Sequence, residues 1–399
     1  MSQIYADKKY IKYLTSITDK HYKEQEPVIE CVPNGIIANE HIKGYGVFDK
    51  NFKFVKSSIQ KHKGHKGQFV PQFNHDNLPY VDEDVVYLAH CGKNNFGHFL
   101  LEHINRGWCF LDKKYQKMKV VIVNEIDCKK INDYIYVLLG LLGVKKENII
   151  LLNETTQFKN VYIPTPGFDL TAFYTQKYVD MYDKIADAVT GTDVYEKIYL
   201  SKCKMPVLGQ VHGEAHIQSI FEKNGYKIIY PETLPLTEQI WLARNAKVLA
   251  GCGGTALHLA LFMKPGGKVI QIKRNRVLKD NADTQHLINM AKKLDSVFIA
   301  GSIETVKTPH FSHMPQIISV TKYMKQFFDD NDIKYSQEDI KLPDDVLDAY
   351  VKELGSMNSG KSFMKSVKKS FIHYTSCFLP GRMMRKKYRH FMQRILKMD

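Results

Sequence analysis

The stretch NNFGHFLLEH, residues 94–103, combines a helical pattern of apolar residues with two imidazoles and a carboxylate. His98 and Glu102 are four residues apart, so they share one helix face, whereas His103 points away from it. A helical zinc site of the HxxEH kind needs a closer spacing, so a metal is not favoured. A buried carboxylate beside a histidine is suited to accept a proton from a hydroxyl group. A purely structural role, with Glu102 capping backbone groups and His98 in the core, stays open.

A second chemical pattern is the glycine turn of VLAGCGGTALHLALF, residues 248–262. A buried strand runs into Gly251, Gly253 and Gly254, and a helix is expected to start near Thr255. Ligands of parallel α/β sheets bind at the carboxyl ends of strands, where glycines and a helix N-terminus accept a phosphate. The pattern is not GxGxxG and lacks the acid that binds ribose, so a nicotinamide dehydrogenase is disfavoured. A tight turn that only packs the helix is the alternative.

Alternating strands and helices must position both patterns. Residues 27–90 predict a strand-rich start, and a helix is expected over 94–111. Further strands are predicted at 119–125, 148–153, 160–166, 197–202, 226–232, 247–254 and 267–273, with a helix ending at Gly143 and a long polar helix over 171–197. Short loops between strands and helices are typical of parallel α/β domains. We therefore expect two Rossmann-like domains facing a cleft.

Length and composition support this division. A chain of 399 residues suits two domains, and 44% hydrophobic with 25% charged residues is globular composition. The predicted boundaries are residues 1–180, 190–330 and, for C-terminal helices, 331–399. Seven cysteines without a CxxC pair indicate neither a disulfide framework nor a zinc ribbon. The N-terminus lacks the apolar core of a secretory signal, and the longest apolar run, residues 134–144, is shorter than the roughly 20 residues of a membrane span.

The positive charge is concentrated in a tail. Residues 361–399 hold eleven Lys and Arg residues against one acid, which accounts for +10 of the net charge of +15. Apolar residues recur there at helical spacing, a pattern typical of helices that lie on an anionic membrane surface. Packing of the same helices back onto the fold is the alternative. Because the charge is not spread over the fold, no nucleic-acid partner is expected.

Three blocks resemble glycosyltransferase family 61. NNFGHFLLEHINR is similar to its N-Y-G-H-[FW]-L-x-[DE] block, and KIYLSK to its strand ending in Ser-Arg. Residues 226–272 resemble the run from a P-E strand through E-Q-I to the glycine turn, an L-F-M segment and P-G-x-x-V-I-x-I. The family's His-Gly-Ala-Gly-Leu-x-Asn is not kept at the turn, where its His and Asn are lost. Lys202 replaces the Arg of Ser-Arg, and only Glu214 remains of Arg-x-x-x-Asn-Glu.

The resemblance, over residues 40–275, implies a GT-B fold, a nucleotide-sugar donor and inversion at the anomeric carbon. Glu102 would be the catalytic base, with His98 orienting it. The donor-binding residues implied or suggested are Gly251, Gly253, Gly254, Thr255, Ala256, Lys202, Glu238 and His258, and the acceptor-side residues are Asn94, Asn95 and Arg106. Basic residues after the strands, Lys202, Lys204, Lys273 and Arg274, would offset the leaving diphosphate, so no metal or cofactor is expected. His212, Glu214 and His216 either touch the donor or form a surface cluster.

The function expected is therefore an inverting glycosyltransferase that extends a bacterial capsular or lipopolysaccharide glycan. Its partners would be a nucleotide sugar, an oligosaccharide or lipid-linked acceptor, and the anionic inner face of the membrane, which residues 361–399 would contact from the cytoplasm. The alternative is a catalytically silent module that binds a nucleotide or polymer within a capsule assembly complex.

Overall fold

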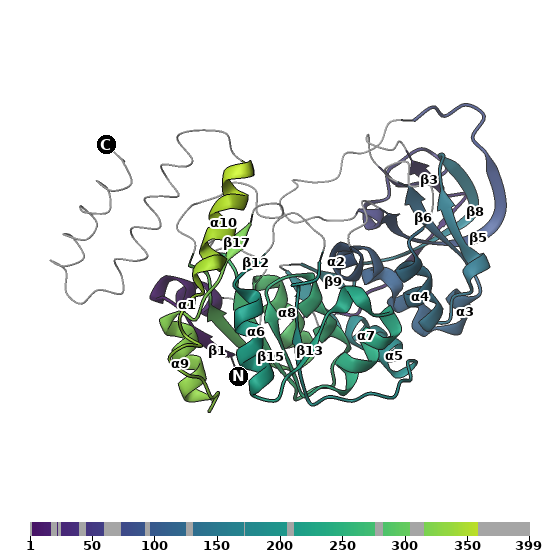
Figure 1. Cartoon of the computed structure of the whole chain (residues 1–399). Helices are drawn as coiled ribbons and strands as arrows, with labels where there is room; N and C mark the ends of the chain where they lie inside the picture. The colour runs from purple at the N-terminus through teal and green to yellow at the C-terminus, as the bar shows by residue number, and fades with distance from the viewer. Residues whose placement is uncertain are drawn as a thin grey trace.

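The computed structural model describes residues 2–16, 22, 25–39, 45–59, 73–91, 96–124, 131–170, 172–205, 211–275, 282–303 and 315–357. Strands and helices alternate around two large β-sheets in this part of the chain, and two further sheets have two strands each, so the predicted α/β class is confirmed (Figure 1). The predicted basic tail, residues 361–399, lies outside the described residues, as do Asn94 and Asn95.

Within the described residues the first sheet has seven strands, in the order β4-β3-β8-β5-β6-β7, with β2 also paired to β8. Their bounds are β2 (Ile29–Pro33), β3 (Ile36–Asn39), β4 (Tyr45–Phe48), β5 (Tyr80–Cys91), β6 (Lys119–Asn124), β7 (Ile149–Leu152) and β8 (Thr156–Pro164). β5 runs parallel to β6 and β8, and β6 to β7, whereas β2, β3 and β4 add antiparallel pairs. The carboxyl ends of β5 and β8 therefore meet at one edge of the sheet.

One continuous helical segment follows β5, as predicted for residues 94–111. It starts as α2 (Phe96–His98), widens into the π-helical turn η4 (Phe99–His103) and narrows into the 3-10 helix η5 (Ile104–Leu111). The short α3 (Lys113–Gln116) and α4 (Asp133–Leu141) follow on the same sheet. Gly143 after α4 has a φ of 97°, which confirms the predicted glycine at the helix C-terminus.

The second sheet has six strands among the described residues, all parallel, in the order β1-β16-β15-β14-β11-β13. Their bounds are β1 (Ser2–Tyr5), β11 (Lys197–Leu200), β13 (Lys227–Ile229), β14 (Val248–Cys252), β15 (Lys268–Lys273) and β16 (Asp295–Ala300). Counted from β11, the chain order is 2-1-3-4-5, the doubly wound order in which a ligand binds where the winding reverses. That switch point lies between β11 and β14.

Helices and short strands complete the second unit. They are α1 (Lys8–Thr15), α5 (Gln176–Asp187), α6 (Glu214–Lys223), the 3-10 helix η7 (Pro231–Thr233), α7 (Leu236–Asn245), the 3-10 helix η8 (Thr255–Phe262), α8 (Ala282–Ala291), α9 (Lys322–Asp330), α10 (Asp344–Met357) and the paired strands β12 (Val211–His212) and β17 (Gln316–Ile317). The segment expected as one long helix over 171–197 instead holds strand β10 (Phe173–Tyr174), which pairs with β9 (Phe168–Asp169), and then helix α5, which is capped at Ala188. The chain turns after it, and Gly191 lies so close to the Trp241 ring that a Cβ would be 2.5 Å from it.

The N-terminus departs from the predicted division. The first domain was expected to begin at residue 1, but β1 pairs in parallel with β16 and forms the edge of the second sheet. Tyr5 is buried there against Phe327 of α9, at a ring distance of 5.5 Å. Burial of this aromatic side chain stabilises the pairing of a four-residue strand with β16, which lies almost 300 residues later in the chain.

The two sheets are joined through α5, which lies between them in Figure 1. Tyr182 of α5 donates a hydrogen bond to the carbonyl of Leu100 at 2.5 Å, and its ring packs on Phe262 of η8. Asp183 of the same helix pairs with Arg244 and Lys292 at 2.6 and 2.7 Å. One apolar core consequently spans both units. None of the helices in the described ranges is long and apolar enough to cross a membrane.

Candidate active site

The two patterns singled out in the sequence meet in the structure. Gly97 of α2 packs directly on Thr255, the first residue of η8, and a Cβ at position 97 would lie 2.7 Å from Thr255 Oγ1. His98 follows Gly97, and His258 lies on η8 close enough to His98 that the two imidazoles interact electrostatically. The helix with the predicted base and the turn predicted to bind the donor therefore lie in direct contact.

The predicted pairing of His98 with Glu102 is present. His98 Nδ1 is hydrogen-bonded to Glu102 Oε2, across the junction between α2 and the π-helical turn. The Glu102 side chain is 4% exposed and the His98 side chain 42% exposed, so the imidazole lies between solvent and the carboxyl group. With Glu102 ionised, Nδ1–H is the donor, which fixes the tautomer of the ring. Single π-turns inside helices are frequent at functional sites.

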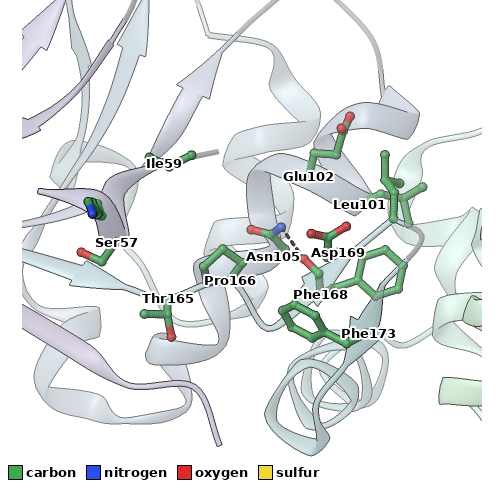
Figure 2. Close-up of a pocket in the computed structure, with 12 residues that line it drawn as sticks. Ser57, Ile59, Leu101, Glu102, Asn105, Thr165, Pro166, Phe168, Asp169 and Phe173 are labelled. Carbon is green, nitrogen blue, oxygen red and sulfur yellow. Dashed lines mark hydrogen bonds between the residues drawn. The ribbon is translucent and has the colours of Figure 1, made fainter. Parts of the chain in front are cut away.

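Glu102 lines a cavity of about 250 Å³ on the first unit (Figure 2). One wall comes from the helix after β5 and the opposite wall from the segment after β8, as expected for carboxyl ends of parallel strands. The cavity is lined by Lys56, Ser57, Ile59, Leu101, Glu102, Asn105, Thr165, Pro166, Phe168, Asp169, Leu170 and Phe173.

Arg106, expected on the acceptor side, builds the walls of this cavity. Its guanidinium group donates to the carbonyl of Pro164 through Nη1 and to that of Ile59 through Nη2, the latter at 2.8 Å. The side chain is buried and lies 5.9 Å from the centre of the Tyr87 ring. Arg106 thus fixes the backbone of two wall segments.

The glycine turn lies beside two cations at the switch point of the second sheet. Lys202 follows β11, Gly254 follows β14 and Arg274 follows β15. A Cβ on Gly254 would be 3.7 Å from Lys202 Nζ and 3.6 Å from Arg274 Nη2, and the φ of 154° also favours glycine. Neither cation forms an ion pair with a carboxylate in the described part of the chain. Two positive groups that converge on an open backbone turn form a suitable site for an anion such as a diphosphate.

A buried carboxyl group lies beneath these cations. Glu214, in the first turn of α6, is 1% exposed and its Oε1 accepts a hydrogen bond from the Lys202 N–H at 3.2 Å. Burial raises the pKa of Glu214 to about 7, against the opposing effects of that hydrogen bond and of the nearby cations. Burial, followed by the repulsion from Arg274, lowers the pKa of Lys202. The charge of the anion site therefore depends on whether Glu214 is protonated.

His258 of the predicted donor set is buried and uncharged. Burial lowers its pKa to about 4, although a hydrogen bond of 3.0 Å between Nδ1 and Gln285 Oε1 opposes the shift. Gln285 donates in turn to Asn289, and Asn289 to Ser296 of β16. This chain of buried hydrogen bonds fixes the imidazole beside the contact between α2 and η8.

The remaining residues predicted to bind the donor pack against neighbouring protein groups or lie on the surface. Gly251 packs against the carbonyl of Leu200, Gly253 against Gln271, and Ala256 against the apolar core. Glu238 is exposed in the first turn of α7, the position of a carboxylate that stabilises a helix dipole.

The structure separates the other sequence candidates. His212 pairs with Glu353 of α10 at 2.6 Å and His216 with the carbonyl of Asp339 at 2.7 Å, so only Glu214 of the three faces the anion site. The ammonium groups of Lys204 and Lys273 lie over the Tyr230 and Tyr10 rings, at 4.1 and 4.4 Å from the ring centres. Of the four basic candidates, Lys202 and Arg274 flank the glycine turn.

Asp169 and Asn105 were missed by the sequence analysis. Both line the cavity beside Glu102. One sequence signal could have identified Asp169. The apolar strand ends at Pro164, and Asp169 lies in the segment TPGFDL, residues 165–170, that follows the carboxyl end of this strand. Among the described residues no group of three or more His, Cys, Asp or Glu side chains could hold a metal ion, and a reaction independent of metal stays a prediction.

Comparison with known proteins agrees with this geometry at the level of the family. The family model described as Glycosyltransferase 61 matches residues 96–270, from α2 to β15. Among solved structures, the bacterial iron-containing dodecameric glycosyltransferase TibC from enterotoxigenic E. coli H10407 is similar at 12% identity, covering 64% of this chain and 80% of that chain with a TM-score of 0.24. The comparison with curated proteins gave no match. Residues 96–270, which hold both the Glu102 helix and the glycine turn, are a glycosyltransferase family 61 region, as the sequence motifs predicted.

Proposed function

We propose that this protein is an inverting, nucleotide-sugar-dependent glycosyltransferase whose two α/β units act in the GT-B manner. The contact between Gly97 and Thr255 carries the proposal, because it brings a carboxylate-lined cavity and an anion site into one region. Family membership supports glycosyl transfer. The donor, the stereochemistry and the domain arrangement are our inference from the site.

The first step of the proposed reaction is activation of the acceptor. An acceptor hydroxyl group in the cavity gives its proton to Glu102, which His98 holds in orientation through the Nδ1–H bond. The acceptor oxygen then forms a bond to the anomeric carbon of the donor. Attack from the cavity side, opposite the diphosphate, inverts the configuration at that carbon.

The second part of the reaction is departure of the nucleoside diphosphate. The bond between the anomeric carbon and the phosphate oxygen breaks, and its electron pair stays on the diphosphate. Lys202, Arg274 and the open backbone at Gly254 stabilise this negative charge, which is a role that fixed cations fulfil without a metal. Protonation of the buried Glu214 increases the positive potential at the same place.

We further propose that the acceptor belongs to a bacterial surface glycan and that residues 361–399 hold the protein at the cytoplasmic face of the membrane. This rests on the basic, amphipathic character of that sequence. A lipid-linked acceptor would then be presented at the surface where the enzyme resides.

The function is tested by calorimetric titration of UDP, GDP and CDP, followed by a transfer assay with the sugar nucleotide of the base that binds. We expect one nucleoside diphosphate to bind with EDTA present. Lys202→Met and Arg274→Met should each weaken binding at least about tenfold, as expected for loss of a charge-assisted contact. Binding that all variants retain would contradict the assigned donor site. Binding without transfer to any glycoside or lipid-linked acceptor would favour the catalytically silent module.

A further inference from the structure

The cavity beside Glu102 has an excess of hydrogen-bond acceptors. Two carboxylate residues line it, Glu102 and Asp169, and Figure 2 shows the Asp169 carboxylate between Glu102 and Phe173. No hydrogen bond or ion pair involves the Asp169 carboxylate among the described residues. Among the described lining residues the one cationic side chain is that of Lys56, which is exposed.

A buried amide supplies an independent observation. Asn105 is 6% exposed, and its Nδ2 donates to the carbonyl of Phe168 at 2.9 Å. That bond fixes the orientation of the amide, so Oδ1 faces the other way, toward the Ser57 side of the cavity (Figure 2). Within the described ranges Asn105 Oδ1 has no hydrogen-bond partner, and the same is true of the buried Ser57 Oγ. A buried acceptor without a donor costs free energy that a ligand hydroxyl group can recover.

The size and the apolar part of the lining narrow the ligand further. A volume of about 250 Å³ is below the roughly 300–1,000 Å³ of sites for drug-sized ligands, so the cavity accommodates one sugar ring. The partly buried Phe173 and the buried Phe168 contribute apolar surface to the lining. Phe168 is immobilised by stacking on Tyr178 at 4.6 Å, so this wall is rigid.

We propose that this cavity binds the terminal sugar of the acceptor, that this sugar is uncharged and presents at least two free hydroxyl groups, and that Asp169 and Asn105 position it. One hydroxyl group donates to Glu102 and is the one that reacts, and a neighbouring hydroxyl group donates to Asp169 or Asn105 Oδ1. A uronic acid or a phosphorylated sugar is excluded, because its anion would face two carboxylates in a confined space. The identification of this sugar as the acceptor rests on the proposed transferase function.

The test uses saturation-transfer NMR on the full-length protein with p-nitrophenyl glycosides. The neutral probes are the β-glucoside, the β-galactoside, the α-mannoside and the β-N-acetylglucosaminide, and the acidic probe is the β-glucuronide, which differs from the β-glucoside only at C6. We expect at least one neutral glycoside to bind and the glucuronide to bind at least about tenfold more weakly than the glucoside or not at all. Equal or tighter binding of the glucuronide, or no signal from any neutral glycoside, overturns the proposal.

Variants assign the site. Asp169→Asn should weaken binding of the neutral glycoside about tenfold and reduce the discrimination against the glucuronide. Asp348→Asn, an exposed change of the same kind on α10, is the matched control and should change neither. Unchanged glycoside binding in Asp169→Asn overturns the assigned role. Titration of the nucleoside diphosphates on the same samples separates the two ideas: glycoside selectivity without any nucleotide binding would refute the transferase and support a sugar-binding cavity.

Discussion

Glu214 provides a test of the anion site through its proton. The pKa of this buried carboxyl group is raised from 4.5 to about 7, mainly by burial, so the folded state binds a proton that the unfolded state releases. The stability of the wild type should therefore fall as the pH rises from about 4.5 to 7 and then level off. Each unit of pKa corresponds to about 1.4 kcal/mol, so the full effect is about 3 kcal/mol, of which about 2.5 kcal/mol develops between pH 5 and 8.

Glu214→Gln removes this titration and keeps an oxygen that can accept the hydrogen bond from the backbone N–H of Lys202. The free energy of unfolding, from urea titrations at pH 5 and 8, should fall by about 2.5 kcal/mol less in the variant than in the wild type over that interval. Glu222→Gln, an exposed change on the same helix, is the control and should retain the wild-type pH dependence. Because the variant lacks the negative charge above pH 7, it should also bind a nucleoside diphosphate more tightly at pH 8. A pH dependence identical to that of the wild type would refute the reasoning.

Three further changes test the rest of the site. Glu102→Gln should leave nucleotide binding unchanged and lower transfer at least about 100-fold, the low end for a general base, and transfer within a few-fold of wild type would remove Glu102 from that role. Gly254→Val should weaken nucleoside diphosphate binding in calorimetry, because the side chain enters the space between Lys202 and Arg274, and unchanged binding in a folded variant would move the donor site elsewhere. Deletion of residues 381–399 should abolish sedimentation with anionic liposomes at low salt, because each basic residue contributes about 1 kcal/mol to the free energy of membrane binding. Transfer to a soluble glycoside should persist in this variant. A full-length protein that does not sediment with these liposomes would contradict the membrane role.

Much of the second unit was predictable because local sequence patterns and chain order agree there. Strands β11, β13, β14 and β15 are apolar runs that end at glycines, prolines or charged residues, and they lie where predicted. Helix α6 ends before Gly225, whose φ of 81° is the conformation that glycine favours after a helix. Apolar strands buried on both faces, with short loops, leave few alternative topologies.

Helix geometry was less predictable than helix position. The segment after β5 was expected as a helix, but its π-helical and 3-10 turns depend on packing against β5, α5 and η8. Similarly, the alternation of His212, Glu214 and His216 suggested one cluster. Gly213, whose φ is 86°, forms a turn directly before α6. Because of this turn, His212 contacts Glu353 and His216 contacts Asp339 in the C-terminal segments, whereas Glu214 is buried.

The sequence by itself determined the α/β class, the glycosyltransferase family 61 motifs within residues 96–270, the His98–Glu102 pair and the glycine turn, because each is carried by short local patterns. Tertiary structure alone decided what these groups face. Asp169 joins Glu102 in the cavity because β5 and β8 are neighbours in the sheet. Lys202 and Arg274 converge on Gly254 because three parallel strands end at one edge, and strand order follows from long-range packing that no local pattern encodes.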